Sequence, residues 1–310
     1  MTTIASSGTA TGAAVREGLT GHKRDVSGTV FLVVLLGSLL FSLAILFILL
    51  ADVMTKGMPV FAERGTDFLT SPLSSNPAKA GVVQGIIGTA ILGVIVAVTA
   101  FPFGLATATY LEEYSGEGRL TRFIQINIRN LAGVPSVVYG LLGLSVFVAL
   151  FQSLGIGTGR NILAGGATLA VLVLPIVIIT SIEALRAVPN ALREAGYGVG
   201  ASRWEVTRQL VLPAAAPGVL TGTVLALSRA LGETAPLILA GAVLGSFSAS
   251  MDQILTGPYT AMPVIVYDWS RRPQEAFRAD AAAAIIVLLA ITLFANAVAI
   301  YLRNRYERTW

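Results

Sequence analysis

Long runs without a charged residue constrain this chain more than any other feature of its sequence. Such runs cover 27–51, 80–111, 130–159, 161–182 and 281–302. A helix needs about 20 mainly apolar residues to cross a bilayer, and each run reaches that length. The sequence therefore predicts an all-α integral membrane protein.

A sixth apolar stretch begins at Gln209 and is interrupted only by Arg229 and Glu233 before residue 252. The first stretch exceeds the apolar region of a signal peptide, and no A-x-A cleavage site follows it, so we interpret it as a retained helix. We therefore expect six transmembrane helices, with cores at 30–51, 85–108, 131–152, 162–182, 215–240 and 281–302.

The residue types that are missing exclude several kinds of chemistry. Cys is absent, and the single His is His22, which excludes thiolate metal sites, Cys nucleophiles and His-dependent catalysis within the chain. None of the three Lys residues lies in a G-x-x-x-x-G-K-[ST] loop, so we expect neither an ATP site nor any other cofactor in this chain.

Basic residues are distributed unevenly between the expected loops. If both termini are cytoplasmic, the inside segments 1–28, 112–129, 183–208 and 303–310 carry 13 Lys and Arg, against 7 in the outside segments. An excess of Lys and Arg marks cytoplasmic loops, so this bias favours both termini inside. It also explains the net charge of +4 without a nucleic-acid partner. We expect 1–28 to be a disordered tail, because it is rich in Ser, Thr, Gly and Ala.

The loop 183–213 is amphipathic and predicts two short helices. Pro189 suits the first turn of one helix, Gly200 breaks the chain, and Ser202 with Glu205 forms a potential capping box for the other. Three apolar residues of the first helix are expected on one face: Leu192, Ala195 and Val199. Such an element either lies on the membrane surface or docks onto a cytoplasmic partner.

Part of this loop resembles a motif of ABC importer permeases, E-A-A-x3-G-x9-I-x-L-P. The spacing is kept throughout, with Gly in place of the second Ala and Leu in place of Ile; the matching residues are Glu194, Ala195, Gly196, Gly200, Leu210, Leu212 and Pro213. The resemblance implies a type I ABC importer permease fold over 80–306, preceded by a first helix and an extracytoplasmic loop at 29–79. It also implies that the loop docks onto a separate ATPase subunit.

Arg229 and Glu233 are two ionisable residues inside an apolar stretch, where each costs about 3 kcal/mol to insert. Spaced i,i+4, they can share a helix face and pair, while Gly232 and Pro236 weaken the helix. The pair is either a structural ion pair or an anion site. The segment resembles the R-A-x-G-E-T motif of phosphate permeases, which implies that Arg229, Glu233 and Thr234 lie on the substrate path.

The segment 129–143 also resembles phosphate permeases, through an A-G-x-P-S-V-x-Y-G stretch. Pro135 is expected to kink the third helix, and Gly133 and Gly140 allow close helix packing. The polar residues Asn130 and Ser136 are candidates to line the path, although helix packing alone would also explain the motif.

Taken together, the resemblances imply the permease subunit of an ATP-driven phosphate importer in a bacterial plasma membrane. They imply as partners a paralogous permease, a dimer of ATP-binding subunits that uses ATP and Mg²⁺, and an extracytoplasmic phosphate-binding protein, besides membrane lipid. Another oxyanion, such as molybdate, tungstate or sulfate, remains an alternative substrate. An intramembrane enzyme is a more distant alternative, because no expected span carries Asp and H-E-x-x-H is absent.

Overall fold

The computed structural model describes residues 26–116, 118–244 and 254–306, so most of the expected tail 1–28 lies outside the described residues. Residues 26–28 already belong to the first described helix, α2 (Val26–Arg64). The chain divides into two compact units that meet between Asp52 and Val53. In the first unit the large apolar side chains of α2 are exposed, as a helix in lipid requires; Phe41, for example, is 69% exposed.

Six helical segments of the described residues are long and apolar enough to cross a membrane, which confirms the expected number. They are Ser27–Arg64, Val83–Tyr114, Ser136–Ser153, Ile162–Arg186, Arg203–Gly232 and Glu275–Tyr301. The chain is therefore a multi-pass membrane protein.

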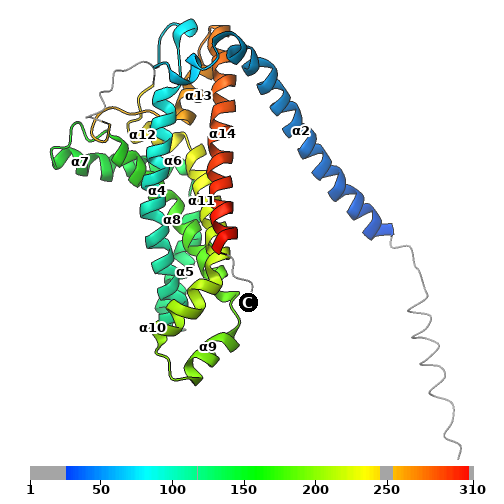
Figure 1. Ribbon diagram of the computed structural model, residues 1–310, viewed down its shortest axis with the longest axis vertical. Helices are drawn as coiled ribbons and strands as arrows, with labels where there is room; N and C mark the ends of the chain where they lie inside the picture. The colour runs from blue at the N-terminus through cyan, green and yellow to red at the C-terminus, as the bar shows by residue number, and fades with distance from the viewer. Residues whose placement is uncertain (1–25, 117, 245–253, 307–310) are drawn as a thin grey trace, which may run out of the picture. The chain divides into compact units, whose positions relative to one another are not determined.

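The second unit is built around α8 (Ile162–Arg186), the most buried of the six spans. Figure 1 shows α4 (Val83–Thr109) and α11 (Leu212–Gly232) running alongside α8, and both pack against it. Glycines allow this close approach: a Cβ at Gly104 would lie 2.6 Å from Val177 Cγ1. The core between these helices consists of small and branched apolar side chains, including Leu92, Val173 and Ala226.

The third expected helix differs from its prediction, because Pro135 breaks it rather than kinks it. Helix α5 (Arg119–Ala132) ends before Gly133, and α6 (Ser136–Leu142) begins after Pro135, whose backbone is extended (ψ 138°). The span continues through the π-helical turn η3 (Gly143–Val148) into α7 (Ala149–Ser153). A proline cannot donate to the preceding turn and disfavours helical geometry in the residue before it, so the chain starts a new helix.

The fifth expected helix, 215–240, is wrong at both ends. It begins earlier, at α10 (Arg203–Val206), and runs through the π-helical turn η4 (Thr207–Val211) into α11. It ends at Gly232, and a separate short helix α12 (Ala235–Leu239) follows. The second short helix expected in the loop is thus the first turn of a span. The first one is α9 (Asn190–Gly198), with Pro189 at its N-cap.

At one end of the second unit, Arg64 fastens a loop to the last span. Its Nη1 lies 3.0 Å from Asp280 Oδ1 and 2.8 Å from the carbonyl oxygen of Pro77, and its Nη2 donates to the carbonyl of Ala80. These contacts join α2, η1 (Pro77–Lys79) and α14 (Glu275–Tyr306). The expectation that no span carries Asp is therefore wrong, since Asp280 lies within Glu275–Tyr301.

After α12 the described chain resumes at 254 and leads into α13 (Met262–Ser270). Tyr259 in this connection is buried, and burial raises the pKa of its phenol. The Tyr259 carbonyl accepts a hydrogen bond from Val243 N at 2.8 Å, and Met262 N donates to Thr89 Oγ1 at 2.9 Å. The segment is thus packed between α4 and the chain after α12. Burial of this kind holds the start of α13 in place.

Candidate functional site

Arg229 stands in the last turn of α11, and its side chain is 47% exposed. Its Nε lies 3.4 Å from Glu233 Oε1, so the expected pair is present. The two residues do not share a helix, however, because α11 ends at Gly232 and the backbone of Glu233 is extended (ψ 126°). The carboxylate therefore reaches back over the helix end, and the guanidinium stays accessible.

The break after Gly232 brings two of the sequence motifs together. Helix α12 carries Pro236 in its first turn and packs against α6. The contact is close at Gly140 of α6: an added Cβ would lie 2.9 Å from Pro236 Cα and 2.8 Å from Leu239 Cδ1. Tyr139, beside Gly140, is buried, and its hydroxyl donates to the carbonyl oxygen of Leu131 at 2.9 Å. The motifs around 136–140 and 229–236 thus form one region.

The other three candidate path residues differ in their position relative to this region. Ser136 is the first residue of α6 and Thr234 precedes α12; both side chains are half-buried. Asn130 is exposed on α5, on the other side of the Pro135 break. The structure therefore places Ser136 at the start of α6, Thr234 at the N-cap of α12, and Asn130 on a different element.

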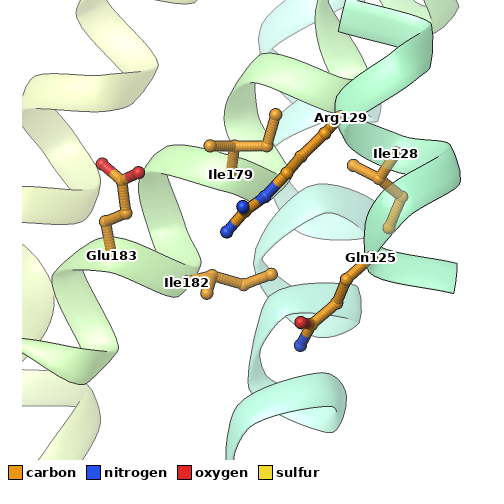
Figure 2. Close-up of a pocket in the computed structure, with 6 residues that line it drawn as sticks. All are labelled: Gln125, Ile128, Arg129, Ile179, Ile182 and Glu183. Atoms are coloured by element: carbon orange, nitrogen blue, oxygen red, sulfur yellow. The ribbon is translucent and has the colours of Figure 1, made fainter. Parts of the chain in front are cut away.

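A small pocket lies between α5 and α8, and Figure 2 shows Arg129 extending from α5 toward α8. Its volume is about 10 Å³, which holds a single water molecule at most. This pocket is too small for an oxyanion. Its lining is formed by Gln125, Ile128, Arg129, Ile179, Ile182 and Glu183.

The loop between α8 and α10 has the expected turn and cap. Gly200 adopts a positive φ of +85°, which favours glycine. Ser202 Oγ accepts a hydrogen bond from Glu205 N at 3.4 Å, and Glu205 Oε2 accepts one from Ser202 N at 2.7 Å. This reciprocal arrangement is the predicted capping box. The backbone reverses between α9 and α10 as the sequence indicates.

The buried face of α9 differs from the expected one. Gly196 is buried, and an added Cβ would lie 2.8 Å from Val206 Cγ2 and 2.9 Å from Leu210 Cδ1. Leu192 is half-buried, but Ala195 is exposed and Val199 is 85% exposed, so these three do not form one buried face. The close approach at Gly196 explains the difference, because a glycine at this position lets the backbone of α9 pack directly against η4.

The outer face of α9 combines a carboxylate with apolar groups. Glu194 is exposed in the middle of the helix rather than at its start, beside Tyr197, which is 44% exposed. Trp204, just beyond the turn, is 55% exposed. Figure 1 shows α9 at one end of the second unit, and exposed aromatic side chains near a carboxylate are typical of a docking site. Of the remaining motif residues, Leu210 and Leu212 are half-buried and Pro213 is exposed.

Sequence reasoning missed the ion pair between Arg193 and Glu113, which joins the loop to the end of the span Val83–Tyr114 at 2.7 Å. Two adjacent glutamates, Glu112 and Glu113, close an otherwise uncharged span, and the loop 183–208 carries four Arg residues. That charge balance was the available signal. Among the described residues, no group of three or more His, Cys, Asp or Glu could hold a metal ion.

The comparison with known families defines the class of this protein, which is a membrane subunit of a transporter rather than an enzyme. A model of the family described as "Binding-protein-dependent transport system inner membrane component" matches residues 100–308, and the chain belongs to this family. The chain is thus one membrane component of a transporter that also contains ATPase subunits and a second permease.

Several relatives carry more specific names. Phosphate transport system permease protein PstA 1 of Mycobacterium tuberculosis is 35% identical over 216 residues, covering 69% of this chain and 68% of that protein. The phosphate transport system permease protein PstA of Haemophilus influenzae is 34% identical over 278 residues, covering 88% and 91%. A probable ABC transporter permease, YqgH of Bacillus subtilis, is 39% identical over 189 residues, covering 57% and 60%.

Solved structures support the fold. A methionine ABC transporter, MetNI, matches with a TM-score of 0.60 at 16% identity, covering 73% of this chain and 96% of that chain. A bacterial ABC transporter for the acidic polysaccharide alginate matches with a TM-score of 0.59 at 14% identity, covering 91% and 99%. The expected type I ABC importer permease fold is confirmed.

Proposed function

We propose that this chain is the PstA-type permease subunit of an ATP-driven phosphate importer. The names of the relatives support phosphate as the substrate, and the accessible Arg229 supports a path for an anion. Within the described residues, Arg229 donates only through Nε, so both Nη groups remain for a ligand. A guanidinium keeps its charge and can bind two oxygens of a phosphate at once.

Transport inward requires an energy source, because the membrane potential opposes an anion. Moving one negative charge against 100 mV costs about 2.3 kcal/mol, and a divalent phosphate costs about twice as much. The sequence has no phosphate-binding loop, so we assign ATP and Mg²⁺ to a separate ATPase dimer (PstB-like). The single purified subunit should hydrolyse no ATP.

We further propose that both termini are cytoplasmic and that 80–306 is the permease domain. The coupling residues of the loop 183–213 would then face the ATPase, with Glu194, Ala195 and Gly200 on its exposed part. The path would be completed by a paralogous permease (PstC-like) and loaded by an extracytoplasmic phosphate-binding protein (PstS-like).

Uptake of radiolabelled phosphate tests the proposal. Cells that lack this chain should lose high-affinity uptake, and the wild-type gene should restore it. Competition with unlabelled molybdate, tungstate and sulfate separates the alternatives. If one of these anions is imported in an ATP-dependent way and phosphate is not, the substrate assignment is wrong.

A further inference from the structure

The π-helical turn η2 (Tyr110–Tyr114), which ends the span that starts with α4, receives three arginines from the loop 183–213. Arg186 Nε lies 2.9 Å from Glu112 Oε2, and Arg193 Nη2 lies 2.7 Å from Glu113 Oε1. The Arg203 guanidinium stacks 5.2 Å from the centre of the Tyr114 ring. Single π-turns often mark functional positions in a helix. Here the turn presents three consecutive side chains to one loop.

Arg193 is the central member of this set, because it joins three elements. Besides Glu113, its guanidinium donates to the carbonyl oxygens of Leu185 at 2.9 Å and Val188 at 2.8 Å, and to Asn190 Oδ1 at 3.2 Å. The turn η2, the end of α8 and the start of α9 are therefore all in contact with the Arg193 side chain. The exposed fractions of the Arg193 and Glu113 side chains are only 16% and 5%.

Helix α9 has few other attachments to the second unit. Most of its residues are exposed, and its apolar contacts run through Gly196 to Val206 and Leu210 and through Leu192 to the buried cluster that contains Leu185 and Val206. A helix of nine residues is only marginally stable without such contacts. A displacement of α9 can therefore reach the spans by an apolar route, through Gly196 and Leu192, and by a polar route, through Arg193 to α8 and to η2, which continues α4.

We propose that Glu113 and Arg193 are positioning residues that transmit the movement of α9 to α4 and α8, and so couple ATP hydrolysis to transport. This inference rests on the proposed function of the loop as the ATPase contact. The pair suits a mechanical link, because a buried, multiply hydrogen-bonded ion pair holds one geometry, whereas an exposed pair exchanges with water.

The neighbouring pair provides a matched control. Glu112 is the same residue type, one position away, and also contacts an arginine of the loop. Its partner Arg186 is 45% exposed. If any loss of charge at η2 disturbed the protein, Glu112→Gln would have the same effect as Glu113→Gln.

The test uses the complete transporter, with both permeases, the ATPase dimer and the binding protein, in proteoliposomes. In Glu113→Gln we expect the amount of phosphate imported per ATP hydrolysed to fall at least about tenfold. The reason is that the ion pair no longer holds η2, α8 and α9 in one relative geometry. ATP hydrolysis should persist but no longer respond to the loaded binding protein. Glu112→Gln should stay within about twofold of wild type on both measurements.

The proposal is overturned if Glu113→Gln keeps the wild-type ratio, or if Glu112→Gln lowers it equally. If Glu113→Gln fails to assemble, Arg193→Lys decides: lysine keeps the charge but cannot serve Glu113 and both carbonyls together. A fall of about threefold in the ratio then supports the link, and an unchanged ratio overturns it. Failure of the wild-type complex to import phosphate would refute only the substrate, because control of hydrolysis by the binding protein reports the link independently.

Discussion

Two Arg–Glu pairs in this molecule differ in burial, in distance and in the number of hydrogen bonds that the arginine makes. Arg193 and Glu113 are 80 residues apart in sequence, 2.7 Å apart in space and almost buried. Arg229 and Glu233 are four residues apart, separated by 3.4 Å, and the arginine is 47% exposed. The first guanidinium uses its donors on three elements, whereas the second uses one. The same two residue types therefore hold several elements together in the Arg193–Glu113 pair and leave a guanidinium accessible in the Arg229–Glu233 pair.

The difference has an energetic meaning. Removing one partner of a buried pair leaves an uncompensated charge and costs roughly 3–5 kcal/mol. An exposed pair with loose geometry contributes about 0–1 kcal/mol. Disruption of the first pair should therefore appear mainly in stability and coupling, and disruption of the second mainly in transport.

The largest expected effect is the loss of stability of the subunit when the buried pair is broken. Arg193→Gln should lower the free energy of unfolding of the purified subunit by about 3–5 kcal/mol, because Glu113 is left charged and unpaired. Glu233→Gln should lower it by less than about 1 kcal/mol. Thermal unfolding in detergent measures both. Equal shifts for the two variants would mean that the two pairs do not differ in the way proposed.

The next largest effect concerns transport through the open pair. Arg229→Gln should reduce phosphate uptake about a hundredfold, because the path loses its fixed charge, while the protein accumulates normally in the membrane. Arg229→Lys should keep part of the activity, since the charge persists without the forked geometry. Uptake of radiolabelled phosphate and immunoblots of membranes measure the two quantities.

The double variant Arg229→Gln with Glu233→Gln separates path from structure. If the pair were structural, Arg229→Gln alone would misassemble and the double variant would recover. Normal uptake by the double variant would exclude Arg229 from the path.

Much of this architecture could be predicted because it depends on neighbouring residues. Six spans follow from local hydropathy, and the turn at Gly200 with its Ser202–Glu205 cap follows from local backbone chemistry. The break at Pro135 was predicted only as a kink, because a proline weakens a helix whether or not a neighbour holds it in line. Here α12 packs against α6, beyond the break.

The features that sequence missed depend on contacts between distant residues. Glu113 and Arg193 meet only once α4, α8 and α9 are packed, so their pairing has no local pattern. The prediction of the buried face of α9 was wrong for the same reason. Periodicity favoured the apolar residues, including Val199, but the position of η4 selects Gly196. Among the described residues, hydropathy therefore predicts the membrane spans better than it predicts the contacts between them.

A third prediction concerns the turn that presents α9 to its partner. Gly200→Val places a branched side chain at φ +85°, which costs roughly 1–2 kcal/mol, although no atom lies within 4 Å of the added Cβ. We expect membrane insertion to persist and the ATPase to be lost during copurification. Gly200→Ala and Gly198→Ala form a matched pair, since only position 200 has a positive φ. An intact, active Gly200→Val complex would refute the docking role of the loop.

The smallest effect tests the apolar route from α9 to α11. The two departures from the family motif, Gly196 and Leu210, contact each other, with Leu210 Cδ1 only 2.9 Å from where a Cβ on Gly196 would lie. Gly196→Ala should therefore destabilise the subunit by about 1 kcal/mol, because crowding outweighs the gain in helix propensity. Leu210→Ile, which moves one methyl group from the δ to the γ position, should relieve the crowding. The double variant should then be more stable than Gly196→Ala alone, by thermal unfolding. Strict additivity of the two substitutions would show that these positions do not compensate each other.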